Sequence, residues 1–423
     1  MRLQLGNLEP AKPASALRDV LHTAALALLL VPGAAKAQTD PTDRIDFTTL
    51  LYGEQSRTQI FEPVVRFTHL MPDGQWVSGQ LGIDVITGSS PTGALPSGIV
   101  QTRTSASGRT ITSPAGQIPM APFKDRRVSL DGQWQRPWGR LVSSTLGGRF
   151  SREKDYQSFG VDGKFSTDLM HRLLNITIGG GVSRDSVFPV GGTPAGLSDG
   201  TIIHTGSNAK NVSNVLLGAS RILSRRWMVS VNGTRTFESG YLTEPYKLIT
   251  VENRVTGAPV SSLTDKRPST RDRSSVLLSS VYHLTDDVVY TSYRYYWDTW
   301  NVRSHTIDLK YRRVLDADTY LEPLLRYYQQ SAANFYTVGL IQGAPLPEYA
   351  TSDYRLGKLR TITLGATYGF RAGDVPGSFT LRGQYMRQAG DSSPPGAIGI
   401  QRNFDLSPSI SIFSAVVGYT FDY

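Results

Sequence analysis

The sequence contains no cysteine. This absence excludes a disulfide framework, a thiolate metal site and covalently attached c-type haem, which needs paired cysteines. Only six histidines are present, no two of them at a metal-ligand spacing such as H-x-x-x-H, and there is no Walker loop. The body of the chain also lacks a long apolar run and any sustained helical periodicity. We therefore expect no cofactor, no metal site and no catalytic group.

The first 37 residues have the pattern of an export signal. Arg2, Lys12 and Arg18 form a basic start, residues 23–31 are apolar, and "AKA" (35–37) places small residues at a cleavage site. An apolar core of about 9 residues is too short to cross a bilayer as a helix. We predict cleavage after Ala37, leaving 38–423 as one domain; an uncleaved anchor is the alternative.

The charge balance is mildly basic. The formal net charge of +9 falls to +7 without residues 1–37, and the excess forms no block. A spread of this kind gives little support for nucleic-acid binding.

What the chain does contain is period-two alternation. In "FGVDGKF", Phe159, Val161 and Phe165 share one face, whereas Asp162 and Lys164 share the other. Many such runs reach about 11–14 residues, and aromatic residues lie near their ends, whereas strands of soluble sheets average about 5–6 residues. Outer-membrane barrels need about 9–11 residues per strand, an apolar exterior, aromatic girdles and a polar lumen. The pattern predicts an all-β, up-and-down transmembrane barrel.

Connection lengths support the same architecture. About sixteen strands are expected, at roughly 44–55, 57–71, 75–89, 126–137, 140–153, 156–168, 172–185, 211–222, 226–240, 273–284, 287–299, 302–314, 318–330, 358–371, 377–389 and 409–423. With the N-terminus in the periplasm, all periplasmic turns are short. The five long loops (about 90–125, 186–210, 241–272, 331–357 and 390–408) all fall on the extracellular side, as expected for such barrels.

The C-terminal strand alternates through Tyr419, Phe421 and Tyr423, the last residue. It resembles the terminal signal that the outer-membrane assembly machinery recognises, although Phe is the usual final residue. We therefore expect that machinery and outer-membrane lipid as partners.

Two stretches, "LYGEQSR" (51–57) and "DVITGSSPTGA" (84–94), stand out because they recur together in a known family. The piece "TGSS" is not an aspartic-protease turn, because Ile86 holds the place of the essential carboxylate. With "SREKDYQS" (151–158), these stretches resemble the uncharacterised Gram-negative family termed domain of unknown function 3570. The motif positions are Tyr52, Glu54, Arg57, Asp84, Thr87, Gly88, Ser89, Ser90, Pro91, Thr92 and Gly93.

The resemblance implies an outer-membrane barrel and no known activity. The gene settings of that family imply a periplasmic or lipoprotein redox partner. In the expected register, Glu54, Arg57 and Asp84 lie near the outer rim, where a Glu–Arg pair across a hairpin either fixes register or forms part of a constriction.

Alternation places charges of both signs inside the barrel. We expect a lumen lined by Glu62, Arg66, Asp131, Arg149, Asp162, Lys164, Arg294, Asp308, Lys310, Arg312, Glu322, Arg326 and Arg382. Such a wall suits a porin-like, non-enzymatic channel for small polar solutes or ions in the outer membrane of a Gram-negative bacterium. The same charges also suit an occluded, non-conducting barrel that serves as a scaffold or sheath for a redox partner.

Overall fold

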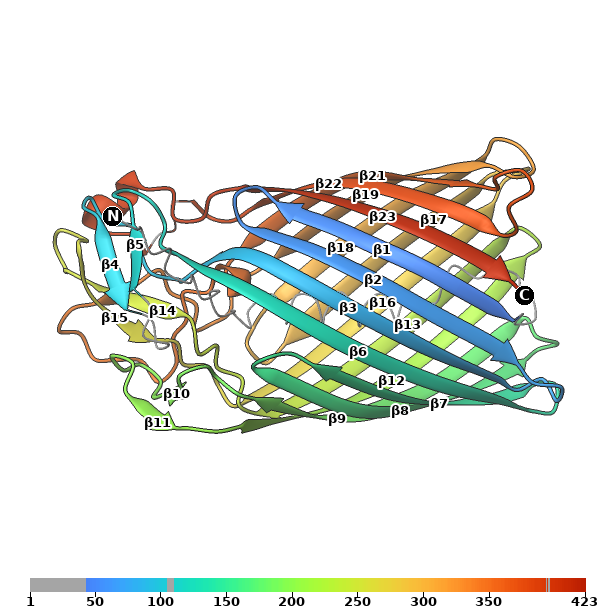
Figure 1. The fold of residues 1–423 in the computed structure, drawn as a ribbon, viewed down its shortest axis with the longest axis horizontal. Coiled ribbons are helices and arrows are strands. Elements are labelled where there is room, and N and C mark those ends of the chain that lie inside the picture. Colours follow the sequence, from blue (N-terminus) through green and yellow to red (C-terminus); the bar gives the residue numbers. More distant parts are fainter. Residues whose placement is uncertain (1–42, 105–109, 393, 395) are drawn as a thin grey trace, which may run out of the picture.

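The computed structural model describes residues 43–104, 110–392, 394 and 396–423. The predicted signal segment lies outside the described residues. Sixteen strands of the described chain close into one antiparallel barrel (Figure 1). In barrel order they are β1 Arg44–Glu54, β2 Thr58–Leu70, β3 Trp76–Pro91, β6 Met120–Trp138, β7 Val142–Arg152, β8 Tyr156–Leu169, β9 Leu174–Val187, β12 Asn208–Ser224, β13 Trp227–Gly240, β16 Thr270–His283, β17 Val288–Asp298, β18 Arg303–Val314, β19 Tyr320–Gln330, β21 Leu359–Phe370, β22 Ser378–Ala389 and β23 Ile410–Asp422.

The predicted fold is confirmed, because each barrel strand pairs with its sequence neighbour in the barrel and β1 pairs with β23. The largest boundary difference is in β6, which begins at Met120 rather than near 126. There β3 and β6 continue their ladder through Ser89↔Pro122 and Pro91↔Met120. The two strands thus extend beyond the rest of the wall.

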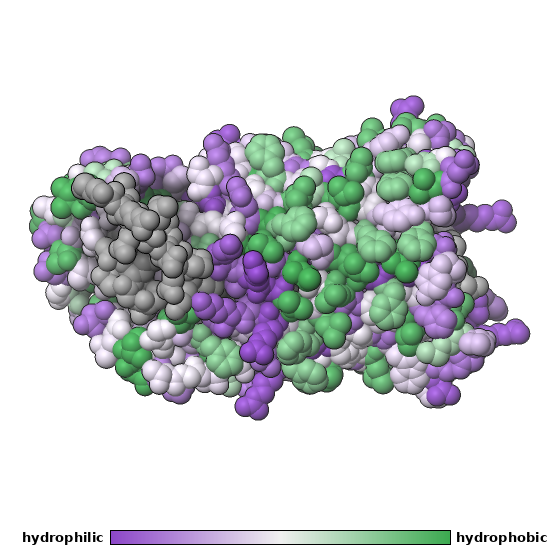
Figure 2. Space-filling view, viewed as in Figure 1, coloured by the Kyte–Doolittle hydropathy of each residue, from purple (hydrophilic) through white to green (hydrophobic). Residues whose placement is uncertain are grey.

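The barrel wall has an apolar exterior. Leu81, Ile83, Leu130, Phe159 and Leu364 are between 42% and 59% exposed in the isolated chain. On the face that Figure 2 shows, hydrophobic residues gather over the barrel part of the molecule, with hydrophilic side chains toward its ends. Because burial of apolar surface drives folding in water, an exterior of this composition is stable only against lipid.

The five long connections gather at one end of the barrel (Figure 1) and fold into a cap. We use "cap" for the described parts of 92–119, 188–207, 241–269, 331–358 and 390–409. The cap holds the short strands β4 Gln101–Thr104, β5 Thr110–Ser113, β10 Thr193–Pro194, β11 Ile202–His204, β14 Leu248–Glu252, β15 Pro259–Thr264 and β20 Leu340–Ile341, and the 3₁₀ turns η2 Tyr354–Leu356 and η3 Gly399–Asn403.

The cap has its own small core, in which Ile249 and Gln401 are fully buried. β14 pairs with β15 and, in parallel, with β20, so two different loops share one sheet. No helix in the described part of the chain is long and apolar enough to span a membrane.

Candidate functional site

The first motif stretch lies on the inner wall near the cap. Tyr52 points inward and packs with Ile60, Ile86 and Phe123, which form a small buried apolar cluster. The register explains this grouping: Tyr52 is opposite Ile60, and Ile60 is opposite Ile86. The Tyr52 hydroxyl donates a 2.8 Å hydrogen bond to Glu54 Oε1. Ile86 therefore belongs to the packing of the inner wall.

The expected ion pair between Glu54 and Arg57 is not found among the described residues. Arg57 instead lies over the ring of Tyr354, 5.4 Å from its centroid. The 55–57 hairpin turns Arg57 toward η2, which belongs to a different loop. The sequence prediction failed here because it considered only residues on neighbouring strands.

Asp84 is also separate from Glu54. Its side chain is 2% exposed and forms an ion pair with Arg127 of β6, its register partner. Asp84 thus joins β3 to β6 on the inner face.

The second motif stretch connects the barrel to the cap. At Gly88, where φ is +146°, a Cβ atom would lie 2.1 Å from the carbonyl oxygen of Arg57. The backbone N–H of the next residue, Ser89, donates a 3.0 Å hydrogen bond to that oxygen. Only glycine permits this close approach of two strands at Gly88.

The residues that follow bind the loops directly. Lys247 Nζ donates to Ser90 Oγ at 3.1 Å and to the carbonyl oxygen of Pro91. Thr92 donates its N–H to Pro119 and accepts the N–H of Leu248 at 2.7 Å. Thr87, in contrast, points outward. The motif is therefore the hub at which the 92–119 and 241–269 loops meet.

A buried ionic group lies behind this hub. Arg267 bonds Asp265 at 2.7 Å and Asp353 at 2.9 Å. Arg355 pairs with Asp353 and, at 3.6 Å, with Glu244. We call these residues, which come from two loops, the cap network: Glu244, Lys247, Asp265, Arg267, Asp353 and Arg355.

Burial and neighbouring charges shift the ionisation of the cap network. Burial lowers the pKa of the Lys247 ammonium to about 8, opposed by the charge of Asp353. Burial raises the pKa of Asp265 to about 6, opposed by Arg267. Although burial acts against it, Arg355 and Lys247 hold the pKa of Asp353 well below its usual range. Asp353 is therefore the charged centre to which the cations bind.

Glu252 of β14 is a contrasting buried acid. Its side chain is 1% exposed, and neither carboxylate oxygen has a hydrogen-bond partner among the described residues. Burial raises its pKa to about 7. The cap thus contains a carboxyl group that gains a proton near neutral pH.

The register places every charge expected for the lumen on the inner face. Arg149 bonds Asp162 at 2.7 Å, Arg326 pairs with Asp308, and Lys310 and Arg312 share Glu322. Arg382 donates to Thr367 Oγ1. Asp131 lies opposite Arg149 in the strand register. Within the described chain, no carboxylate lies within 4.0 Å of the cationic groups of Arg66, Lys164 or Arg294.

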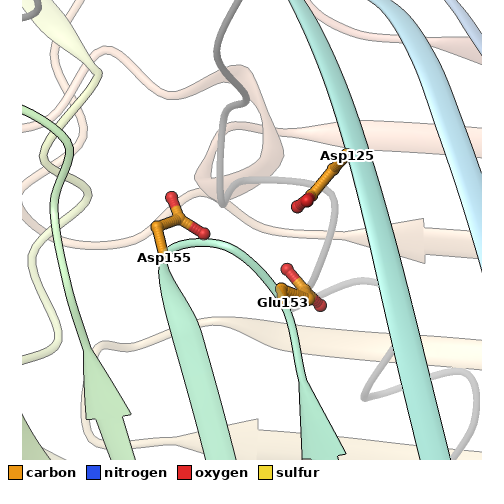
Figure 3. Close-up of side chains that lie close together, drawn as sticks. All are labelled: Asp125, Glu153 and Asp155. Carbon is orange, nitrogen blue, oxygen red and sulfur yellow. The ribbon is translucent and has the colours of Figure 1, made fainter.

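Three carboxylates converge where the β7–β8 hairpin meets β6. Oxygens of Asp125, Glu153 and Asp155 lie within 4.8 Å of one another (Figure 3). Asp155 also accepts a 2.9 Å hydrogen bond from Tyr246 of the cap. Carboxylates of this kind can hold Ca²⁺, but an acidic cluster alone does not define a metal site. Glu153 and Asp155 belong to the 151–158 motif stretch, but their meeting with Asp125 depends on how the β7–β8 hairpin lies against β6, which the sequence pattern does not predict.

The C-terminal residues lie at the end opposite the cap. Tyr419 stacks between Phe379 and Phe421, and its hydroxyl bonds the carbonyl oxygen of Pro376 at 2.6 Å. Tyr423 is 63% exposed and donates its N–H to Asp43. These aromatic residues form part of the girdle at the turn end of the wall.

Several solved barrels are similar to this chain. The toluene transporter TodX of Pseudomonas putida matches with 10% identity, full coverage of both chains and a TM-score of 0.38. A mutant of the ferric enterobactin receptor PfeA of Pseudomonas aeruginosa matches with 11% identity over 89% of this chain and 59% of the receptor, at a TM-score of 0.42. A loop-deletion mutant of OmpT, an outer membrane protein of Vibrio cholerae, matches with 8% identity over 90% and 99% of the chains, at 0.39.

No curated protein matches the sequence. A family model described as "Protein of unknown function (DUF3570)" matches residues 18–421, nearly the whole chain. This chain, an outer-membrane type of β-barrel, therefore belongs to the DUF3570 family.

Proposed function

We propose that this chain is an outer-membrane channel for small polar solutes or ions, with no chemistry of its own. The observation that carries the proposal is that three inner-wall cations, Arg66, Lys164 and Arg294, have no carboxylate among the described residues close enough for an ion pair. An isolated charge in a dry interior costs several kcal/mol, about 3–5 kcal/mol when one partner of a buried pair is removed. Water in the lumen removes this cost, and a hydrated lumen is the route that polar solutes need.

The cap limits what can pass. Its loops are joined by the cap network and anchored to the wall at Ser90 and Pro91. A closed set of hydrogen bonds and ion pairs does not deform continuously, so the cap behaves as a fixed restriction at the extracellular entrance. We expect small, steady conductance rather than the large currents of an open pore.

The test is single-channel conductance of the mature chain, residues 38–423, in a planar bilayer. Discrete, salt-dependent steps are expected, and the reversal potential should show weak preference for anions, because no carboxylate of the described chain pairs with Arg66, Lys164 or Arg294. A triple Gln variant at these positions should lose that preference while it keeps its heat-modifiable β-structure.

A non-conducting scaffold for a periplasmic or lipoprotein redox partner is the second candidate. The buried core of the cap favours it, because a compact cap over the barrel end is what a closed entrance requires. The two candidates differ in one experiment: if the folded protein and a variant with a disrupted cap network both insert and pass no current, the channel is excluded and the scaffold remains.

A further inference from the structure

A group of cations lies on the outer face of the wall, just below the cap. Lys124 and Arg126 follow one another on the outward face of β6, Arg152 ends β7, Lys154 lies in the adjoining hairpin, and Arg184 is on β9. All five side chains are exposed. We call these residues the rim patch. Figure 2 shows hydrophilic side chains gathered between the cap and the apolar wall.

Strand register keeps the rim patch together. Arg152 lies opposite Val128, two residues from Arg126 on the outward face of β6, and Arg184 lies opposite Phe159. Since neighbouring strands are about 4.8 Å apart, long side chains on β6 to β9 can reach one ligand. No outward position of these four strands carries an acid. The acids nearby in sequence, Glu153 and Asp155, turn inward toward Asp125.

The rest of the rim differs. Arg235 of β13 is paired with Asp272 at 3.4 Å, Arg303 is on β18, and Arg360 and Arg387 face outward on β21 and β22. General interfacial placement of basic residues would distribute them evenly around the rim. The clustering on β6 to β9 is therefore a local feature of this face.

A groove of about 850 Å³ adjoins the rim patch on the same outer face. Leu51, Phe61, Tyr385 and Phe413 form its apolar sides, and the glycines at 53 and 383 leave it open, since a Cβ added at either meets nothing within 4 Å. Val85 and Thr87 also line it, and they are the register partners of Arg126 and Lys124. The groove and the cations thus form one continuous surface.

We propose that this surface binds a phosphorylated glycolipid of the outer leaflet, with its phosphate groups on the rim patch and an acyl chain in the groove. Lys and Arg bind phosphate oxygens by charge-assisted hydrogen bonds. Clusters of 4–8 such residues at a membrane surface are typical of anionic-lipid sites. The rim patch also lies at the depth of the lipid phosphates, because Val128 and Leu130, the next outward residues of β6, are exposed where the hydrocarbon region begins.

The test is lipid retention by the folded full-length protein in detergent, measured by native mass spectrometry in titrations with two probes. Bisphosphorylated hexa-acyl lipid A is compared with its monophosphorylated form. We expect tighter retention of the bisphosphorylated lipid, by about tenfold, and a preference that weakens as salt rises. Inorganic phosphate at the same concentration should not displace either lipid, because it cannot fill the groove.

Two variants separate the parts of the site. The rim variant K124Q/R126Q/R152Q/K154Q should lose the preference for the second phosphate, whereas R303Q on β18, across the barrel from β6, should keep it. The groove variant G53L/G383L should weaken both lipids equally. G132L is its control, since a Cβ at Gly132 on β6 also meets nothing within 4 Å. Heat-modifiability checks that each variant is folded.

Equal retention of the two lipids by the unmodified protein, or an unchanged preference in the rim variant, overturns the proposal. Displacement of lipid by inorganic phosphate also overturns it, because the site would then be one for free phosphate. None of these results depends on whether the lumen conducts.

Discussion

The barrel wall and the cap obey different rules of construction. In the wall, inside and outside alternate with a period of two, and each strand pairs with its neighbour in sequence. In the cap, residues more than 80 positions apart meet, as Arg267 and Asp353 do. Below the rim patch, the charges of the wall that we named for the lumen face inward, whereas the charges of the cap network are buried in protein. The wall is a repetitive structure that should tolerate single substitutions, whereas the cap depends on a few specific contacts.

The largest effect should come from Asp353→Asn. Its removal leaves Arg267, Arg355 and Lys247 without their shared anion, and breaking a buried pair costs about 3–5 kcal/mol. The cap should become protease-sensitive and exchange its amide hydrogens faster, while the wall remains heat-modifiable.

Asp318→Asn is the matched control. Asp318 pairs with Arg371 at 3.5 Å in an exposed turn at the other end of the barrel. Exposed pairs contribute about 0–1 kcal/mol, so little change is expected. If both variants behaved alike, the distinction between a specific cap and a tolerant wall would be lost.

A single charge on the lipid face tests the wall itself. Leu364→Lys places an ammonium in the hydrocarbon, which should lower the free energy of unfolding by about 2–4 kcal/mol. Gln384→Lys, on the inner face of the neighbouring strand, should cost much less because the lumen is polar. Guanidinium unfolding in lipid vesicles measures both; comparable losses would contradict the assigned inside and outside.

Acid should stabilise the cap relative to the wall through Glu252. The carboxyl group has a pKa near 4.5 when exposed and about 7 in the folded cap, so the folded state binds the proton more tightly. Its contribution is fully present below pH 4.5 and is lost as pH rises through 7, by at most about 3 kcal/mol.

Hydrogen exchange of the 241–269 loop at pH 5 and pH 8 measures this dependence. Glu252→Gln should remove most of the pH dependence of cap stability. A smaller pH dependence should remain below pH 6, caused by Asp265. An unchanged pH profile in the variant would exclude Glu252 as the group responsible.

The smallest effect expected is that of Gly93→Ala. Gly93 has φ of +90°, and a Cβ there would lie 2.5 Å from the carbonyl oxygen of Leu248. The left-handed conformation costs a non-glycine residue about 1–2 kcal/mol, and the contact adds to this. Gly98→Ala in the same loop meets nothing within 4 Å and should be silent in a proteolysis assay of the cap. Equal protease sensitivity of the two variants would show that Gly93 does not anchor the loop.

How far the sequence predicts this molecule follows the same division. Alternation located the sixteen strands of the described wall and the inward side of Arg294 or Asp308, because a period of two needs only local information. It did not predict that Arg57 meets Tyr354, or that Lys247 holds Pro91, because these contacts join different loops. The motif around Ser90 was recognised by its resemblance to a family, and its role as the hub became visible only from the folded loops.

The pairing of β1 with β23 has a kinetic consequence. Fifteen of the wall's sixteen strand pairs join wall strands that follow one another along the chain, whereas the sixteenth joins the first to the last, with Arg44 opposite Asp422. Bringing β1 and β23 together closes nearly the whole wall into one loop, which costs about 5 kcal/mol in chain entropy. Contacts between residues far apart in sequence also slow folding. This seam should therefore be the last to form and the first to open, so that the barrel's lifetime in the membrane is determined by its two terminal strands.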